Sequence, residues 1–437
     1  MLNFWGLGIG GWGLGIGGTR RDDVKRGYVF WLRKSALLAG CAIGRIRVYF
    51  QSESFWEHGM GYSGHFRRLV TVILVALLLT GCASATRPRN MAGVPTDPSV
   101  IFIQDSQLRV QKLSESTSQV LASNVRIGCV PYVLAPDGSK VAYQDQKGAW
   151  WAVSTAGGTP QAITSKAVQN VSWLPSSQGV YYSDGTDIYA QLFDQAKSNA
   201  VLKGGGQTYE SPTFSANGNT ISFITHPRAN LADVRVAKGD GTDVRSLGRV
   251  LLTPSEVTEP CPPQVLWSPD NARFLLNPGR NAYIFYLAGG TPLPLPAHGV
   301  GAVYAWAPDG SKVAFNDGQG TVWLVSAGGT GVRNVAEATS GPAWSSDSTS
   351  LAFVSPERAG HALRTFDVAR NSAQTIVQVT GDELTNPQWV PGGTRSLVYT
   401  RQNRAGDSTI WMVPTSGSAP RQIASGHHAS LFLRPRN

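Results

Sequence analysis

An all-β fold is predicted by three features of the 437-residue sequence. Glycine and proline are abundant, with 49 and 26 residues, while only 15% of the residues are charged. From residue 131 onward, a short unit recurs about every 40 residues. Each unit offers short alternating stretches that are separated by Asp-Gly or Gly-Gly turns. Four short strands per repeat at this period are typical of a β-propeller with four-stranded blades.

The repeat unit is clearest in two copies, which read Leu-Ala-Pro-Asp-Gly-Ser-Lys-Val-Ala-Tyr over 134–143 and Trp-Ala-Pro-Asp-Gly-Ser-Lys-Val-Ala-Phe over 306–315. Five weaker copies begin at the aromatic anchors Trp173, Phe214, Trp267, Trp344 and Trp389. Successive anchors are 39, 41, 53, 39, 38 and 45 residues apart. Because one large anchor occupies the same place in each unit, we expect these side chains to pack neighbouring blades together rather than to stack on a ligand.

These copies resemble the WD-like repeats of TolB-type β-propellers, over about 340 residues. The resemblance implies the propeller fold but no particular activity, since propellers host hydrolases, lyases, receptors and scaffolds alike. TolB proteins place a separate α/β domain before a six-bladed propeller. Here only about 16 residues lie between Cys82 and the first expected strand, so we expect that domain to be absent.

The number of blades follows from the two ends of the repeat region. Residues 99–122 supply three strands but no anchor strand, whereas 429–435 supply an anchor strand with no unit after it. Phe432 lies 43 residues beyond Trp389, in phase with the other anchors. Joined, the two ends make a composite blade that closes the ring and leaves no free edge. Seven complete units and this blade predict eight blades, with seven as the alternative if a weak unit merges with its neighbour.

A secretory signal precedes the repeats. His-Phe-Arg-Arg at 65–68 is followed by eleven mostly apolar residues and then by Thr80, Gly81 and Cys82. This apolar run is shorter than the roughly 20 residues that a membrane-spanning helix needs. The ending Leu-Thr-Gly-Cys resembles the lipobox of bacterial lipoproteins, which implies lipid transfer to the Cys82 thiol and cleavage between Gly81 and Cys82. A second match ends at Cys41, but Arg33 and Lys34 interrupt the apolar stretch before it.

These features divide the chain into four segments. Residues 5–18 are a perfect tandem of Trp-Gly-Leu-Gly-Ile-Gly-Gly, and a signal that starts at Met60 has an ordinary length. We therefore expect 1–59 to be spurious upstream translation, 60–81 to be the signal peptide, 82–98 a flexible tether and 99–437 the propeller. Ala83 after the cysteine resembles the sequence that permits transfer to the outer membrane in diderm bacteria; in a monoderm, the anchor would lie on the outer face of the cell membrane.

The charge distribution argues against nucleic-acid binding. Residues 1–81 hold ten Lys or Arg and four Asp or Glu, whereas 82–437 hold 28 and 24. The mature chain therefore carries only about +4 of the total charge of +10, and it has no basic run that would neutralise phosphates. We expect a monomer.

Two cysteines remain in the mature chain beside Cys82, namely Cys129 and Cys261. They occupy nearly equivalent places in units three blades apart, which would put them across the channel, beyond the roughly 7 Å that a disulfide spans between Cα atoms. However, the interval before Trp267 contains an insertion around 248–263 that could carry Cys261 across. A disulfide therefore stays open. The same insertion, with Glu256 and Glu259, is the candidate partner loop.

No motif for enzyme chemistry occurs in the sequence. It contains no Gly-x-Ser-x-Gly elbow and no phosphate loop, and the Gly-rich stretch at 6–18 follows no expected strand, so it is not a dinucleotide-binding loop. Carboxylates recur at Asp137, Asp270, Asp309, Asp184 and Asp240, where we expect hairpin turns rather than paired acids or calcium loops. We therefore expect no catalytic residue, metal or cofactor. The predicted function is a membrane-tethered binding or scaffold module for a protein, peptide or envelope polymer; the alternative is a lyase or hydrolase that uses the central channel.

Overall fold

The computed structural model describes residues 12–17, 29–34, 96–128, 130–164, 167–168, 170–228, 230–251, 264–277, 281–295, 302–393 and 395–435. The chain forms two compact units, Met1–Ala92 and Gly93–Asn437. In the first unit, β1 (Trp12–Gly17) pairs antiparallel with β2 (Val29–Lys34), with Trp12 opposite Lys34. The described residues of both units form strands and turns, and none of them forms a helix that could cross a membrane.

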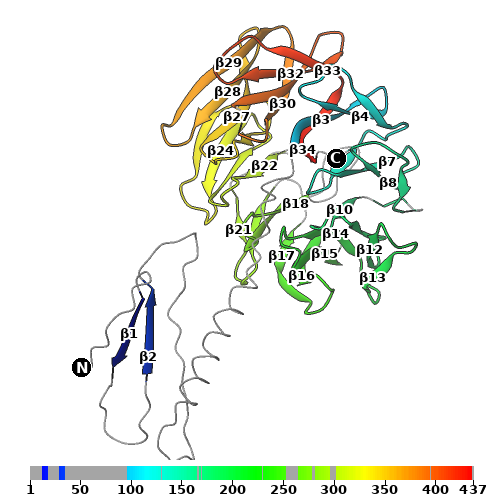
Figure 1. The fold of residues 1–437 in the computed structure, drawn as a ribbon, viewed down its shortest axis with the longest axis vertical. Coiled ribbons are helices and arrows are strands. Elements are labelled where there is room, and N and C mark those ends of the chain that lie inside the picture. Colours follow the sequence, from blue (N-terminus) through cyan, green and yellow to red (C-terminus); the bar gives the residue numbers. More distant parts are fainter. Residues whose placement is uncertain are drawn as a thin grey trace, which may run out of the picture. The chain divides into compact units, whose positions relative to one another are not determined.

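The second unit is an eight-bladed β-propeller (Figure 1), as the sequence predicts. The first three complete blades are β6 (Tyr132–Leu134), β7 (Lys140–Gln144), β8 (Trp150–Ser154) and β9 (Gln161–Ala162); β10 (Val171–Trp173), β11 (Gly179–Ser183), β12 (Ile188–Leu192) and β13 (Asn199–Leu202); and β14 (Tyr209–Phe214), β15 (Thr220–Arg228), β16 (Leu231–Lys238) and β17 (Arg245–Leu251).

Four more complete blades follow in chain order. They are β18 (Gln264–Trp267), β19 (Arg273–Asn277), β20 (Tyr283–Tyr286) and β21 (Leu293–Pro294); β22 (Val303–Trp306), β23 (Lys312–Asn316), β24 (Thr321–Ser326) and β25 (Arg333–Glu337); β26 (Ala343–Trp344), β27 (Ser350–Glu357), β28 (Gly360–Asp367) and β29 (Ser372–Thr380); and β30 (Glu383–Trp389), β31 (Ser396–Gln402), β32 (Ser408–Pro414) and β33 (Arg421–Ser425). All pairings within these sheets are antiparallel, so short hairpins suffice to connect the strands.

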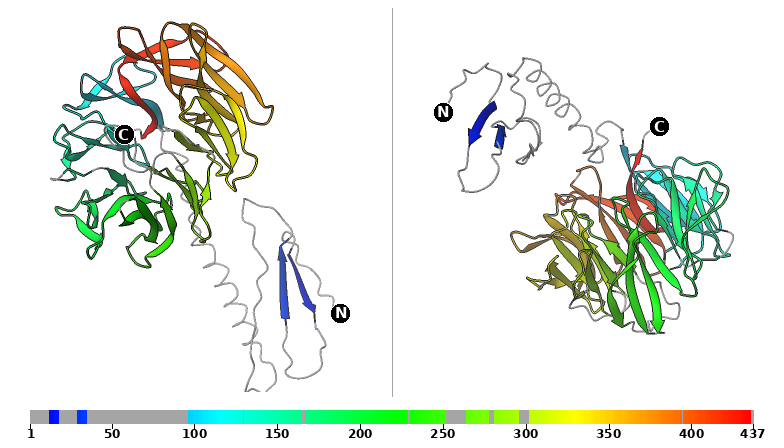
Figure 2. Two further views of the ribbon diagram at one scale, coloured as in Figure 1. Left: turned by 180° about the vertical axis from the view of Figure 1, so that it is seen from behind. Right: turned by 90° about the horizontal axis from the view of Figure 1, so that it is seen from below.

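The eighth blade joins the two ends of the repeat region, and we call it the closing blade. It consists of β34 (His427–Pro435), β3 (Thr96–Gln104), β4 (Gln107–Lys112) and β5 (Gln119–Ala122). Strand β34 pairs antiparallel with β3, with Pro435 opposite Thr96. Figure 2 shows the C-terminal strand beside β3 in both views. This confirms the predicted composite blade, except that β3 begins at Thr96, within the expected tether, because its first residues already pair with β34.

The hydrophobic core is divided among the blade interfaces. Eight clusters of buried residues are found in the described part of the chain, and each combines residues from two neighbouring sheets. One cluster contains Trp150 of β8 and Trp173 of β10, for example, and another contains Phe102 of β3 and Ile410 of β32. Eight blades with eight shared cores make a closed ring. Each blade therefore packs against a neighbouring blade on both of its faces.

The anchor tryptophans join successive blades by hydrogen bonds as well as by packing. The first strands of neighbouring blades contact one another, and we call them the inner strands. In five blades, the indole N–H of the anchor donates to a backbone carbonyl on the inner strand before it: Trp173 to Val133 (2.9 Å), Trp267 to Thr213 (3.2 Å), Trp306 to Leu266 (2.9 Å), Trp344 to Ala305 (3.1 Å) and Trp389 to Ala343 (3.1 Å). Each acceptor directly precedes the anchor of its own blade. The predicted structural role of the anchors is therefore confirmed.

The expected insertion before Trp267 begins later than the sequence suggests. Residues 248–251 belong to β17, which pairs with β16 up to Leu251 opposite Leu231. A bulge at Val234 and Arg235, together with Gly248 at a φ of 141°, keeps the strand in register. The segment therefore starts after Leu251, and the candidate partner residues Glu256 and Glu259 lie outside the described residues.

Candidate functional site

A pocket, which we call the closure pocket, lies where the ring closes. Its volume is about 600 Å³, within the range of small-ligand sites. It is lined by β34, by the strands β30, β31 and β32 of the preceding blade, and by the start of β6. The lining residues are Val130, Pro131, Tyr132, Thr385, Asn386, Thr400, Gln402, Gly406, Ser408, His427, His428, Ala429 and Ser430. They come from three successive blades: the β30–β33 blade, the closing blade and the β6–β9 blade. The closing blade exists only because the two chain ends pair with each other.

Irregular backbone shapes this pocket. Asn386 and His428 adopt φ angles of 51° and 50°, in the left-handed region that residues other than glycine rarely occupy. Each sits at a register shift, between Thr385 and Gln388 in β30 and opposite Ile101–Ile103 in β34. Such residues cost about 1–3 kcal/mol and persist where the surroundings hold them, often at functional sites.

The bulge in β34 brings two histidines together. Consecutive side chains of a regular strand point to opposite faces, but His427 and His428 both line the pocket. Their ring centroids are 4.9 Å apart, with the ring planes at 70°. Partial burial lowers the pKa of His427; burial and the neighbouring His427 together lower the pKa of His428. Both imidazoles are therefore neutral at pH 7, and each offers one donor and one acceptor.

Polar side chains fasten the pocket walls to β34. The Tyr132 hydroxyl donates to the His428 carbonyl and lies 3.0 Å from Ser430 Oγ. Gln388 Nε2 donates to the Ala429 carbonyl at 2.6 Å, and its Oε1 accepts from the Leu431 N–H at 2.9 Å. Burial raises the pKa of Tyr132 far above its ordinary value, so its phenol stays protonated. At the ring closure, β30 and β6 thus hold β34 through an amide and a phenol in place of the indole contacts of other blades.

The lining is polar but uncharged in the part of the chain that the structure describes. Hydroxyl, amide and imidazole groups supply the polar atoms, and no Asp, Glu, Lys or Arg is among the lining residues. Thr400 is only 5% exposed, and its Oγ1 has no hydrogen-bond partner. A buried hydroxyl without a partner costs free energy, so the fold leaves one polar group beside the pocket unsatisfied.

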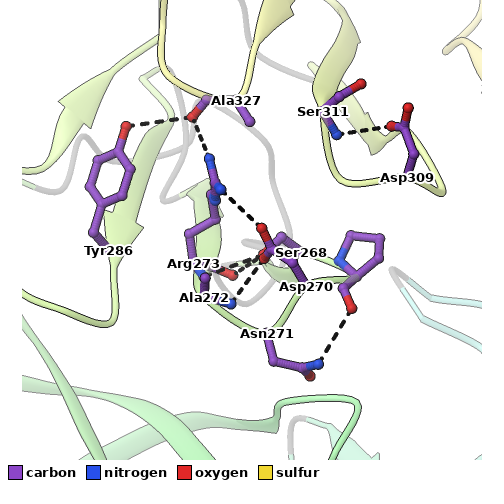
Figure 3. Close-up of polar contacts among 10 residues, drawn as sticks. Ser268, Asp270, Asn271, Ala272, Arg273, Tyr286, Asp309, Ser311 and Ala327 are labelled. Atoms are coloured by element: carbon purple, nitrogen blue, oxygen red, sulfur yellow. Dashed lines mark hydrogen bonds and ion pairs between the residues drawn. The ribbon is translucent and has the colours of Figure 1, made fainter. Parts of the chain in front are cut away.

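The recurring aspartates occupy hairpin turns, as predicted. Figure 3 shows Asp270 accepting from the N–H of Ala272 at 2.9 Å and pairing with Arg273 at 2.9 Å. Asp309 accepts from the N–H of Ser311 at 2.9 Å; hydrogen bonds from the backbone N–H and hydroxyl of Ser311 hold its pKa below the ordinary value. The same pattern holds for Asp137, Asp184 and Asp240, which accept from Ser139, Thr186 and Thr242. These carboxylates stabilise turns and do not gather into an acidic site.

Arg273 extends this turn toward the next blade. Its Nη1 donates to the Ala327 carbonyl at 3.2 Å, which the Tyr286 hydroxyl also reaches at 3.4 Å (Figure 3). Both contacts link the β18–β21 blade to the turn after β24, so this polar cluster serves blade packing.

A further polar pair lies on the inner strand β14 and its neighbour β15. Glu210 Oε2 and His226 Nε2 are 3.0 Å apart, next to a bulge at which Ser211 has a φ of 50°. Ser211 Oγ and His226 Nδ1 are buried without a hydrogen-bond partner among the described residues. The pair shares the bulged geometry of β30 and β34 but does not line the closure pocket.

The site residues predicted from sequence lie outside the described residues. This applies to Gly81 and Cys82 of the cleavage site, to Cys129 and Cys261 and to Glu256 and Glu259, so these remain predictions. The closure pocket was not anticipated. Its one visible signal is the adjacent pair His427 and His428 at the start of the last strand.

Similar proteins were found only among solved structures. No protein-family profile matches the chain, and no curated protein matches it. A structure of the dihydro-heme d1 dehydrogenase NirN in complex with DHE has a TM-score of 0.56 and 12% identity, covering 79% of this chain and 77% of that chain. A eukaryotic initiation factor gives a TM-score of 0.50 and 12% identity, covering 78% of this chain and 99% of that one.

Two further structures come from named bacteria. Dipeptidyl peptidase 4 of Porphyromonas gingivalis matches with a TM-score of 0.50 and 11% identity, over 68% of this chain and 53% of that chain. TolB of Acinetobacter baumannii matches with a TM-score of 0.36 and 15% identity, over 71% of this chain and 89% of that chain. The three likenesses with TM-scores of 0.50 or above show the fold alone at these identities, and function has to be argued from the site.

Proposed function

We propose that the chain is a lipid-anchored, extracytoplasmic β-propeller that acts as a binding module for a protein, peptide or envelope polymer. The observation that carries the binding role is the closure pocket, with its polar, uncharged lining. A carboxylate or ammonium group of a ligand would lose its hydration there without gaining a counter-charge. The pocket therefore suits an uncharged polar segment, whose hydroxyl or amide groups exchange hydrogen bonds with neutral side chains.

Tethering would restrict where this pocket works. The lipobox-like sequence 79–82 supports attachment through Cys82. Three acyl chains would hold the protein on a membrane nearly irreversibly, on the outer membrane facing the periplasm in a diderm or on the outer face of the cell membrane in a monoderm. A tethered receptor meets envelope ligands at a raised local concentration, so even modest pocket affinity would suffice.

The anchor is tested by substituting the two lipobox cysteines separately. In cells fed an alkyne-labelled fatty acid, we expect the wild-type chain to carry label and to sediment with membranes. Cys82→Ser should lose both properties, because a hydroxyl cannot form the thioether. Cys41→Ser is the matched control and should behave like the wild type. Label that survives Cys82→Ser but disappears in Cys41→Ser would assign the anchor to Cys41 instead.

The binding role is tested by filling the pocket from its rim. Ser408→Trp places a large side chain in the lining, whereas Ser418→Trp places one on the exposed loop between β32 and β33 of the same blade. We expect the wild type and Ser418→Trp to retain the same ligands from detergent-solubilised envelope and from enzymatically released cell-wall fragments. Ser408→Trp should retain at least about tenfold less, since it excludes the ligand. Equal retention by all three proteins, with unchanged circular dichroism, would place binding outside this pocket.

A lyase or hydrolase activity is the alternative function, and in the closure pocket it would draw on the two histidines. A neutral imidazole can act as a general base, and His427 and His428 provide two. The retention experiment separates the alternatives, because mass spectrometry identifies an altered ligand if the wild type turns it over and an intact ligand if it only binds.

A further inference from the structure

The two pocket histidines lie side by side, with their ring centroids 4.9 Å apart. Neither ring hydrogen-bonds to a described residue, and both line the cavity. The strained φ of 50° at His428 is what brings the second ring to the same side as the first.

The separation of the rings suits a shared ion. A metal about 2.0–2.1 Å from a ring nitrogen lies roughly 3.2 Å from the ring centroid, so two ligands at a right or tetrahedral angle have centroids about 4.5–5.2 Å apart. The observed separation is 4.9 Å. Because χ2 of histidine turns over a broad range, one nitrogen of each ring can be directed to a common point without moving the strand.

The other lining residues carry no charge. Asn386 and Gln402 donate their amide N–H groups to the carbonyls of Ala429 and Gly406. No three imidazole, thiol or carboxylate ligands gather among the described residues. An ion held here would therefore keep positions open for water or for a ligand.

We propose that His427 and His428 form a binding site for one borderline divalent transition-metal ion, of the class of Cu²⁺, Ni²⁺ and Zn²⁺. Imidazole favours these ions, whereas Mg²⁺ and Ca²⁺ require several carboxylate or carbonyl oxygens. The site goes beyond the binding role proposed above and does not depend on it. An open-coordinated ion would accept an oxygen or nitrogen of the bound segment directly, and this would give the uncharged pocket its one strong point of attachment.

Calorimetric titration of the full chain with each metal chloride at pH 7.5 tests the site. We expect His427→Gln and His428→Gln each to weaken one Cu²⁺ or Ni²⁺ site at least about tenfold. The order of affinity should be Cu²⁺, then Ni²⁺, then Zn²⁺, with no heat from Mg²⁺. His361→Gln is the matched control, because the His361 ring bonds to the Asp382 carbonyl on another blade; it should leave the titration unchanged. Titrations that are identical for the wild type and both pocket variants would overturn the proposal.

Electron paramagnetic resonance of the Cu²⁺-loaded wild type gives a second measurement that requires no folded variant. One equivalent of Cu²⁺ should show coupling to two imidazole nitrogens. Coupling to one nitrogen or none would also overturn the proposal. Loss of the metal site would leave the pocket's role in ligand retention standing, since the Ser408→Trp experiment tests that role separately.

Discussion

Deleting residues 427–437 is expected to abolish the cooperative unfolding transition of the propeller, even though 426 residues remain. The deletion removes β34, which pairs with β3 from Thr96 to Ile103. It also removes Phe432 and Ala429 from two separate inter-blade cores. Strand β3 becomes an unpaired edge, and the ring opens between β30 and β6. Near-ultraviolet circular dichroism and urea unfolding should show a broad, non-cooperative transition.

A circular permutant provides the control for this deletion. Pro435 and Thr96 are register partners, so an Asn-Gly turn can join them as an ordinary hairpin. A chain that starts at Gly128 and ends at Ile127, with this joint, has the same closing blade as one continuous segment. We expect it to unfold cooperatively at nearly the wild-type urea midpoint. A truncated chain that unfolds as cooperatively as the permutant would show that ring closure is dispensable.

Trp150→Ala is expected to destabilise the propeller by about 3–5 kcal/mol, the usual cost of removing a buried aromatic side chain. Trp150 is 0% exposed, and it packs in the core between its own blade and the next. Its indole N–H donates to the Val168 carbonyl at 3.0 Å, so the substitution also leaves that carbonyl without this donor. The shift of the urea midpoint, at unchanged slope, measures the effect.

The neighbouring Trp151→Ala is the matched control. Trp151 points to the other face of β8, is partly exposed, and donates to Asp145 Oδ2 at 2.9 Å in a turn. Its removal should cost less than half as much, because less apolar surface returns to water. Equal losses at the two positions would mean that burial between blades does not dominate the stability of this fold.

The fold was predictable because the turn and anchor residues that determine one blade recur in each repeat unit. The Asp-Gly turns around Asp309 and its equivalents bend the chain locally, and an anchor such as Trp306 reaches only as far as the preceding inner strand. Such contacts repeat with the sequence, so counting the repeats counts the blades. The closing blade followed from the phase of Phe432, since an unpaired anchor strand at one end matched a missing one at the other.

The pocket could not be predicted in the same way. Alternation along a strand assigns His427 and His428 to opposite faces, and only the bulge in β34 places both in one cavity. From the sequence, Thr400 is an ordinary strand residue. Only the structure shows that its buried hydroxyl has no hydrogen-bond partner. The bulge at Asn386 is also invisible in the repeat pattern, because nothing in that pattern requires a φ of 51° there.

The sequence by itself determined the all-β architecture, the eight blades, the joining of the two ends and the structural role of the anchor tryptophans. These features depend on local turn chemistry and on contacts between adjacent repeats, both of which recur along the chain. Only the tertiary structure decided where a ligand could bind. The pocket is assembled from Tyr132, Thr400 and His428, which are far apart in sequence and meet when the ring closes. Its shape depends on two strained residues that the surrounding blades hold in place.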